Sequence, residues 1–469
     1  MTVRAPEAPR RRLGETAWMS LGMAVAITAG GLAVVLGPLA AALVLTLAVL
    51  AAVAWRPVLA PLIYLATLPI LAGVDRGAWI PLLRPNEAVL AVLILGVLAG
   101  IAIRYVRDGL PPLRLTRWDL PVAAFFLIAI GWPACSMLIR GLTPSADDLA
   151  ALLPAAKLAA LLFLTHLTVR TASEVRWCIK VIVGGAVAVA VLAVLQVLGI
   201  EPVAGFLHTY YPVYPVDVHR ATTTLSNSVA TGDYLLIGAV LLITAGLRGM
   251  FSPRGRLACL VILAAGLVAA GQFSTWLGML IAGAVLLRHN PSLRALAVRA
   301  LPVLLIAMLA GAPALADRFG EFGGDKGAPL SWMVRWANLT DLYMPPLFEH
   351  GGFLLGVAPN SVLVPPDAWR DVVYLESGYL QLLWMGGIPL LAAFVWMFCG
   401  VLDAANRARS DVGATGACAA ALVTMWWVVL VLSLLDPHLY LRGPGDVLAV
   451  LIAITLNGVK GGRVHGHSA

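Results

Sequence analysis

The chain has 469 residues, of which 61% are hydrophobic and 12% charged, and its formal net charge is +8. Soluble globular domains carry about 25% charged residues, so the composition excludes that class. The mean hydropathy of +0.91 and the recurring apolar runs, each long enough to cross a bilayer core, predict an all-α, polytopic transmembrane helical bundle.

The apolar runs predict about twelve to fourteen membrane spans. In chain order the runs lie at 17–36, 38–55, 57–73, 86–106, 119–139, 150–169, 176–199, 229–247, 256–272, 274–289, 294–315, 377–402, 412–435 and 443–459. We therefore expect one transmembrane domain over residues 17–459, with a basic tail at 1–16 before it and a short tail at 460–469 after it.

The basic residues indicate the orientation of these spans. If the N-terminus is cytoplasmic, the inside segments carry 22 Lys and Arg residues and the outside segments carry 9. The positive-inside rule then predicts cytoplasmic N- and C-termini. The excess positive charge faces anionic lipid of the inner leaflet, so membrane lipids and not nucleic acid are the expected partners. The abundance of Ala, Leu, Val and Arg is typical of a GC-rich genome and points to a bacterial cytoplasmic membrane.

Several kinds of site are not encoded. The five cysteines fall in or at the edge of predicted spans, which indicates no disulfide or metal framework. There is no phosphate-binding GxxxxGK[ST] motif and no HExxH motif. The adjacent acids Asp147 and Asp148 are more typical of a solvated loop than of a metal site. No cofactor or metal is therefore expected.

Two outside segments are much longer than the other connections. The prolines and tyrosines of 201–226, and its lack of helical periodicity, predict an ordered irregular loop. The second segment, 316–376, is a large extracytoplasmic loop rich in Trp, Leu and Gly, and we expect it to be ordered because unstructured loops of this length are uncommon. Within it, the apolar spacing near Trp332–Tyr343 predicts a short amphipathic helix at the membrane interface.

Two arginines and one acid on the outside segments are candidates for catalysis. A guanidinium is planar and permanently charged, so Arg220 and Arg335 could together bind a diphosphate. Glu376 stands where the loop re-enters the membrane and could take a proton from a hydroxyl nucleophile. The plainer alternatives are arginines that contact lipid headgroups, and an acid that with Ser377 caps the next helix.

Four further residues are candidates for substrate binding. Lys157 and Asp233 lie inside predicted spans on the outer side, where an ionisable group is costly and functional by default. The alternatives are a lysine that snorkels to the surface, and pairing of Asp233 with Lys157 or Arg220. Asn227 and Tyr379 complete the set, each near a predicted span entry.

The order of these features resembles the superfamily of O-antigen ligases and O-antigen polymerases. An outside arginine, Arg220, leads through a Thr-rich stretch to Asn227, with Asp233 behind it. A large outside loop late in the chain then carries Arg335-Trp336 and, after it, a glycine-rich turn at Gly351, Gly352 and Gly356.

The span entry after that loop carries the third part of the resemblance. Ligases have a histidine, then Asn, Ser or Gln, then nine residues and a glycine, then two residues and a small residue or Tyr. Here Glu376 and Ser377 fill the first pair, Gly387 is the glycine, and Leu390 departs from the pattern. Glutamate in place of histidine, followed by GYLQLLWMGG, is more similar to the polymerase members.

The resemblance implies a membrane glycosyltransferase. In that family a glycan on undecaprenyl diphosphate is moved to an acceptor hydroxyl outside the cytoplasmic membrane, without a metal or a nucleotide. By resemblance Arg220 and Arg335 bind the diphosphate, and Glu376 activates the acceptor hydroxyl or positions it. The implied partners are a lipid-linked oligosaccharide donor, an acceptor glycan and other polysaccharide-synthesis proteins.

Three other functions stay open at this stage. A ligase would attach finished glycan to a different acceptor, a transporter or flippase would move the lipid-linked oligosaccharide, and a scaffold would organise a synthesis complex. A flippase should line its interior with charge through the full membrane depth, whereas the intramembrane charges of this chain, Lys157 and Asp233, lie toward the outer side. The sequence therefore favours polymerisation of repeat units of a cell-surface polysaccharide or exopolysaccharide.

Overall fold

The computed structural model describes residues 37–78, 83–108, 116–211, 220–291, 293–294, 330–364 and 373–461, together with 23, 27–28 and 31. The predicted spans at 17–36 and 294–315 and the tails at 1–16 and 460–469 lie wholly or mainly outside the described residues. Parts of the two long outside segments also lie outside them.

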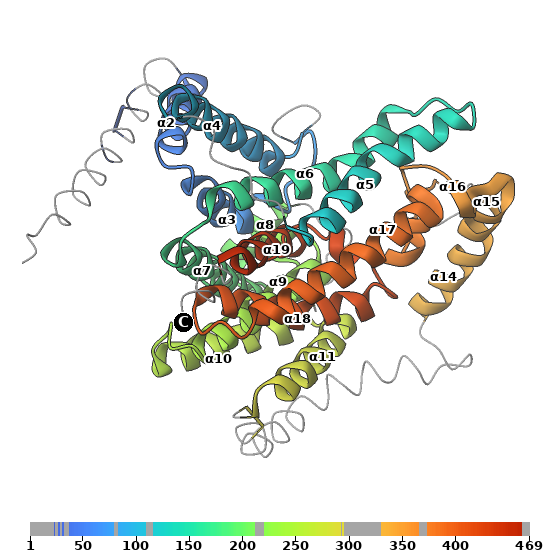
Figure 1. Ribbon diagram of the computed structural model, residues 1–469. Coiled ribbons are helices and arrows are strands. Elements are labelled where there is room, and N and C mark those ends of the chain that lie inside the picture. Colours follow the sequence, from blue (N-terminus) through green and yellow to red (C-terminus); the bar gives the residue numbers. More distant parts are fainter. Residues whose placement is uncertain are drawn as a thin grey trace, which may run out of the picture. The chain divides into compact units, whose positions relative to one another are not determined.

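The described residues are predominantly helical, as predicted (Figure 1). Eight of their helices are long and apolar enough to cross a membrane: α4 (Pro85–Asp108), α5 (Asp119–Ile139), α6 (Ala146–Thr168), α7 (Ala172–Val197), α9 (Ser228–Gly246), α10 (Pro253–Ala270), α17 (Gly378–Ala408) and α18 (Ala414–Leu432). Four shorter apolar helices accompany them: α2 (Pro38–Trp55), α3 (Leu59–Leu71), α11 (Phe273–His289) and α19 (Pro444–Gly461). Each of these helices matches a predicted span, which confirms a multi-pass membrane helical bundle.

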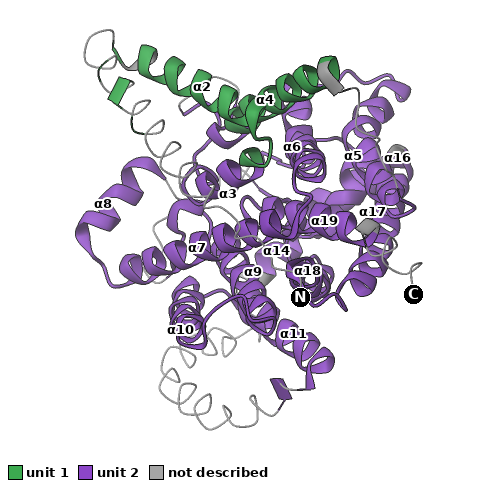
Figure 2. Ribbon diagram, turned by 60° about the vertical axis from the view of Figure 1, so that its left-hand side comes forward, with its two compact units in different colours: residues 1–60, 88–112 green, residues 61–87, 113–469 purple. Residues whose placement is uncertain are grey.

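The chain forms two compact units (Figure 2). Unit 1 comprises residues 1–60 and 88–112, and unit 2 comprises residues 61–87 and 113–469. Within unit 1, α2 and α4 pack closely through glycine, since a Cβ atom on Gly100 would lie 2.4 Å from the carbonyl oxygen of Ala54. All the candidate site residues belong to unit 2.

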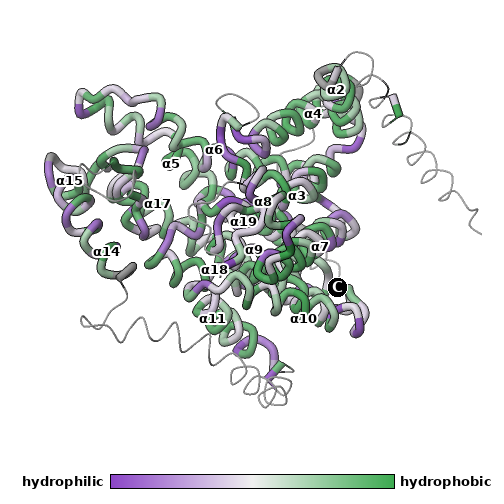
Figure 3. The backbone as a smooth tube through the Cα atoms, turned by 180° about the vertical axis from the view of Figure 1, so that it is seen from behind, coloured by the Kyte–Doolittle hydropathy of each residue, from purple (hydrophilic) through white to green (hydrophobic). Residues whose placement is uncertain are grey.

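Two helices, α9 and α18, form the centre of unit 2. The buried share of the apolar window is 83% in α9 and 72% in α18, against 22% in α10, which packs on the outside of α9 and α7. The chain is hydrophobic along the helices and hydrophilic at many of their ends and connections (Figure 3). An ionisable side chain on α9, such as Asp233, is therefore buried in protein and needs a partner there.

The connections predicted to lie outside contact one another in unit 2. Their contacts are Gly73 with Thr224, Arg76 with Ala150, Arg442 with Asp75, Arg140 with Val357, Asp148 with Asn360, and Asp436 with Arg335. Connections predicted to lie inside do the same, as Arg248 does with Arg409 and Arg117 does with Asp403. This pattern agrees with the predicted alternation of the spans.

The late loop contains the short helices that the sequence predicts. Helix α14 (Leu330–Asn338) continues into a π-helical turn, η3 (Leu339–Tyr343), and then into α15 (Met344–Phe348), η4 (Glu349–Gly351) and α16 (Gly352–Leu355). An isolated antiparallel bridge joins Leu363 to Val373 in the described part of this loop. These helices lie beside α17 (Figure 1).

The prediction of an irregular structure for 201–226 is partly wrong. Helix α8 (Glu201–Tyr210) begins this segment, and a 3-10 turn, η1 (Thr223–Leu225), lies near its end. Pro202 stands in the first turn of α8, where proline favours a helix start and not a separate turn. An apolar cluster contains Val203, Leu207 and Tyr211, which are spaced four residues apart, together with Val74. This spacing is typical of one face of a helix, and the prediction of an irregular loop did not take it into account.

Helix α17 is interrupted at Gly387. This residue has φ 62° and ψ −155°, and Pro389 follows inside the same helix. The interruption frees backbone carbonyls, and the loop satisfies one of them: the Val357 N–H donates to the Trp384 carbonyl at 2.6 Å. Trp132 Nε1 donates to the Gly386 carbonyl at 2.9 Å. The break therefore docks the late loop onto the first half of α17.

We expect Gly387→Ala to destabilise the protein by about 2 kcal/mol or more, because a non-glycine residue at positive φ is strained. Its Cβ atom would also lie 2.3 Å from the Leu354 carbonyl oxygen. The measurement is the thermal unfolding midpoint of the detergent-solubilised protein. Gly184→Ala in α7 is the matched control, since a Cβ atom there meets nothing within 4 Å. Equal midpoints for the two variants would contradict this account of the break.

Candidate functional site

The structure brings Arg335 and Glu376 together. Arg335 lies in the last turn of α14, and its Nε atom is 2.5 Å from Oε2 of Glu376, which lies two residues before α17. The exposed fractions of the two side chains are 38% and 30%. A charge-assisted pair of this length is strong, yet both groups remain open to a ligand.

A second acid, Asp436, approaches the same guanidinium. Its Oδ2 atom lies 4.0 Å from Nη1 of Arg335, and its side chain is 17% exposed. Burial raises the pKa of Asp436 above its ordinary value, and the positive charges of Arg335 and His438 oppose that rise. Arg335 thus approaches two carboxylates, Glu376 and Asp436, from different segments of the chain.

Glu376 does not owe its position to helix capping. Ser377 is the N-cap residue of α17, and its side chain makes no capping hydrogen bond. The start of α17 is held instead by the Gly378 N–H, which donates to the Ser433 carbonyl at 2.8 Å. A Cβ atom on Gly378 would lie only 3.1 Å from Cβ of Ser433, so glycine permits this close approach. The contact places Glu376 beside the connection that carries Asp436.

An apolar cluster holds the other side of Glu376. Tyr343, Val373, Leu375 and Trp384 form a buried group that joins η3 to the first half of α17. The Tyr343 hydroxyl donates to the carbonyls of Ser361 and Val373, at 2.9 and 3.0 Å. Burial and the nearby charge of Glu376 raise the pKa of Tyr343, so its hydroxyl stays a donor at physiological pH.

Asp233 pairs with His438, not with Lys157 or Arg220. Its Oδ2 atom is 2.5 Å from Nδ1 of His438, and the exposed fractions of the two side chains are 6% and 1%. His438 belongs to a 3-10 turn, η5 (His438–Tyr440), between α18 and α19. Its Nε2 atom is buried and has no hydrogen-bond partner in the described part of the chain. A carboxylate that orients an imidazole in this way is an arrangement that can hold a proton.

The charges around His438 favour its protonated form. Burial lowers its pKa, but the negative charges of Asp233 and Asp436 and the hydrogen bond that the imidazole donates to Asp233 outweigh burial, and the pKa is raised. The protonated imidazole in turn stabilises the ionised form of Asp436. Asp436 thus links the buried pair electrostatically to Arg335.

Lys157 forms a separate, closed cluster. Its Nζ atom is 2.7 Å from Oδ1 of Asp446, and the exposed fractions of the two side chains are 8% and 0%. The carboxylate of Asp446 also accepts from the Tyr64 hydroxyl at 2.7 Å and from the Gly443 N–H at 2.9 Å. Since every described contact of this buried ion pair is internal, Lys157 does not snorkel, and its arrangement is typical of a structural residue.

Arg220 and Asn227 border an ordered polar segment. Arg220 is half-buried, and the next residue, Ala221, donates its N–H to the Ala269 carbonyl at the end of α10. Asn227 is the N-cap of α9, and its side-chain oxygen accepts from the N–H groups of Val229 and Ala230. The cap uses its oxygen, so only its amide nitrogen remains for a ligand.

The turn between Arg220 and Asn227 is held by tertiary contacts. Thr223 and Ser226 have positive φ angles of 50° and 55°, which non-glycine residues adopt rarely. Gln196 Oε1 accepts from the Thr223 N–H at 2.9 Å, and Ser226 Oγ donates to the Gly73 carbonyl at 2.9 Å. The segment that begins at Arg220 is therefore rigidly placed.

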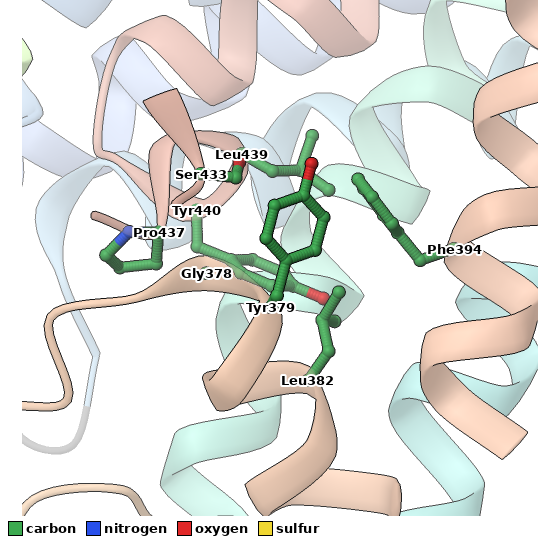
Figure 4. Close-up of a pocket in the computed structure, with 8 residues that line it drawn as sticks. All are labelled: Gly378, Tyr379, Leu382, Phe394, Ser433, Pro437, Leu439 and Tyr440. Carbon is green, nitrogen blue, oxygen red and sulfur yellow. The ribbon is translucent and has the colours of Figure 1, made fainter. Parts of the chain in front are cut away.

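Tyr379 lines a small pocket next to Glu376. The pocket is formed by the start of α17 and the α18–α19 connection, and it is lined by Gly378, Tyr379, Leu382, Phe394, Ser433, Pro437, Leu439 and Tyr440 (Figure 4). The Tyr379 hydroxyl donates to the Leu430 carbonyl at 2.5 Å. The lining is mainly apolar, but the cavity is no larger than a water molecule, so it is a small packing gap beside the site.

Asp148 has a structural role. It forms a capping box with Ser145 at the start of α6, and its Oδ1 atom accepts from the Asn360 N–H at 3.2 Å. The described residues contain no group of three or more His, Cys, Asp and Glu side chains that could hold a metal ion. The chemistry available at the site is that of carboxylates, guanidinium and imidazole.

Sequence reasoning missed Asp436 and His438. They occupy the connection between two predicted spans, 412–435 and 443–459, in the sequence DPHLYLR. Asp436, His438 and Arg442 in so short a connection, in a chain with only 12% charged residues and 8 histidines, were a usable signal. What the sequence lacks is any indication that this connection packs against the start of α17.

Comparison with known proteins adds no family assignment: no family model matches the chain, and no curated protein matches it either.

We expect the Asp233–His438 pair to stabilise the fold more at acid than at alkaline pH. The raised pKa of His438 means that its contribution is fully present below the ordinary histidine pKa of about 6.5 and is lost as the pH rises through the higher folded value. The measurement is the difference in thermal unfolding midpoint between the wild type and the Asp233→Asn/His438→Gln double variant, in which neither group titrates. A difference that grows from pH 6.5 upward would contradict the pairing.

We expect Lys157→Met to cost about 3–5 kcal/mol of stability, because it leaves the Asp446 carboxylate buried without its cation. The Lys157→Met/Asp446→Asn double variant should lose less, since no uncompensated charge remains. Thermal unfolding of the three proteins measures both effects. A single variant that keeps wild-type stability but loses function would assign Lys157 to the substrate instead.

Proposed function

We propose that this protein is a membrane glycosyltransferase that polymerises repeat units of a bacterial cell-surface polysaccharide or exopolysaccharide. It acts in the cytoplasmic membrane with both termini in the cytoplasm. Its donor is a glycan on undecaprenyl diphosphate, and its acceptor is a sugar hydroxyl of a second lipid-linked unit. The reaction takes place outside the membrane, where the late loop meets the start of α17.

The observation that carries the proposal is the half-exposed ion pair between Arg335 and Glu376, with Asp436 beside it. The structural ion pair of Lys157 and Asp446 differs in exposure, because both side chains are almost fully buried and bonded to other groups of the protein. The Arg335 guanidinium can exchange a carboxylate for a diphosphate, which also offers pairs of anionic oxygen acceptors. This exchange would couple binding of the donor diphosphate to release of the Glu376 carboxylate from Arg335.

The proposed reaction is a single displacement. The diphosphate of the donor binds Arg335, with Arg220 as a second cation, and the carboxylate of Glu376 is released. Glu376 takes the proton of the acceptor hydroxyl as its oxygen forms a bond to the anomeric carbon. The bond from that carbon to the diphosphate oxygen breaks, and the diphosphate leaves with the electron pair, stabilised by the guanidinium groups. The new glycosidic bond replaces the bond between the anomeric carbon and the diphosphate, so no nucleotide is consumed.

The distribution of the other charges supports an enzyme over a transporter. Asp436, His438, Arg335 and Glu376 gather at one end of unit 2, on connections and not along the length of the bundle. The buried charge within the bundle, on Lys157 and Asp446, is bonded to Tyr64 and to backbone and does not line a path.

The expected result of Glu376→Gln is a loss of polymer by about 10²–10⁴-fold in rate, as for removal of a general base. In cells, single repeat units should accumulate on the lipid on the outer face while the protein level stays normal. Arg335→Gln should have a comparable effect because the leaving group loses its cation. Gel analysis of polymer length, together with the amount of lipid-linked repeat unit, measures both.

Two matched controls come from the same chain. Glu349→Gln removes an exposed acid of the late loop, and Arg407→Gln removes an exposed arginine whose partner, Asp403, is one helical turn away. Both should leave polymer unchanged. Wild-type polymer in Glu376→Gln and Arg335→Gln would refute the proposed site. Accumulation of repeat units on the cytoplasmic face would assign the protein to the transporter class.

A further inference from the structure

A second group of arginines lies apart from Arg335, and the proposed reaction does not use it. Arg76 and Arg84 belong to the connection between α3 and α4, and Arg442 belongs to the connection between α18 and α19. Arg76 Nη2 is 3.0 Å from Oε1 of Glu87, and Arg84 Nη1 is 4.0 Å from the same oxygen. Arg442 Nη1 is 3.1 Å from Oδ1 of Asp75.

This arginine cluster, Arg76, Arg84 and Arg442, carries more positive than negative charge. Two carboxylates, Glu87 and Asp75, face three guanidinium groups. Burial lowers the pKa of Arg84 to about 10, and repulsion from Arg442 and Arg76 contributes, although the two acids oppose it. The cations are thus close enough to repel one another, and a further anion would relieve that repulsion.

The cluster also has unused hydrogen-bond donors. The Nε atoms of Arg76 and Arg84 are buried without a hydrogen-bond partner among the residues that the structure describes. Buried donors are nearly always satisfied in folded proteins, so two of them beside an excess of positive charge indicate an anion ligand. The pair of Arg442 with Asp75 is the most exposed of these contacts, and such pairs contribute little to stability.

We propose that Arg76, Arg84 and Arg442 bind the diphosphate of the acceptor, the second lipid-linked glycan. This inference rests on the proposed function, since polymerisation joins two glycans that are both attached to lipid diphosphate. The reacting hydroxyl of the acceptor lies at the far end of its glycan from its own diphosphate. The acceptor therefore needs a diphosphate site that is separate from the reaction centre.

One connection of the chain joins the two sites. Asp436 faces Arg335, and Arg442 of the same connection faces Asp75. Arg442 is six positions after Asp436, so their Cα atoms lie at most about 22 Å apart. Both sites lie among the connections that contact one another at one end of unit 2, which is where two lipid headgroups in one leaflet would be presented.

The test is a calorimetric titration of the purified full-length protein in detergent with farnesyl diphosphate. Wild type should bind two molecules. Arg84→Gln should lose one of them, with binding at that site at least about tenfold weaker, as expected for removal of a charged hydrogen bond. Arg442→Gln, whose side chain is 30% exposed and whose loss is easily tolerated, should weaken the same site. Arg335→Gln should weaken the other.

Competition separates a prenyl diphosphate site from general attraction of anionic lipid. Short-chain phosphatidylglycerol, which carries a single phosphate, should displace farnesyl diphosphate from neither site at equal concentration. Displacement from the Arg84-dependent site would overturn the proposal and make the cluster a phospholipid contact. Thermal unfolding of each variant checks that it is folded.

The two proposals fail in different ways. Two binding sites that persist in both Arg84→Gln and Arg442→Gln, or a single wild-type site that depends on Arg335 alone, would overturn the acceptor site and leave the proposed function intact. Failure of the proposed function would appear in cells, as normal polymer in Glu376→Gln, whatever the number of binding sites.

Discussion

The break in α17 at Gly387 is the constraint on which the rest of the site depends. A continuous helix would have no free carbonyl at Trp384, and the Val357 N–H would lose the acceptor that docks the late loop. In an apolar environment every backbone polar group needs a partner, so loop and helix satisfy each other. The docked loop carries Arg335, and the first half of α17 follows Glu376, so one backbone feature brings both members of the ion pair together.

The need for a bonding partner also governs the ionisable side chains. In the bundle interior Asp233 and Asp446 each have a cationic or potentially cationic partner, because an unpaired charge there would be costly. Pairs that are fully enclosed contribute to the fold, while the pairs of Arg335 and Arg442 remain open to solvent. Exposure, more than residue type, is what distinguishes candidate ligand sites from structural ion pairs in this protein.

Much of the architecture follows from the sequence because hydrophobicity and length suffice to identify a membrane helix. The helix near Trp332–Tyr343 was equally predictable from its apolar spacing. Helix α8 was missed because the prolines and tyrosines of the segment 201–226 masked an apolar face of only three residues, Val203, Leu207 and Tyr211. Arg335 and Glu376 were predicted as site residues, but nothing in their separation of some forty residues indicates that they touch.

The sequence by itself determined that this is a membrane helical bundle and where most spans lie, since both depend on local composition. It also supplied the candidate residues for binding a phosphate or accepting a proton. Only the tertiary structure decided which charges meet. It paired Asp233 with His438, Lys157 with Asp446 and Arg335 with Glu376, and it added Asp436, which no motif had marked. Such pairings depend on how helices far apart in the chain pack together, and local sequence does not indicate which helices these are.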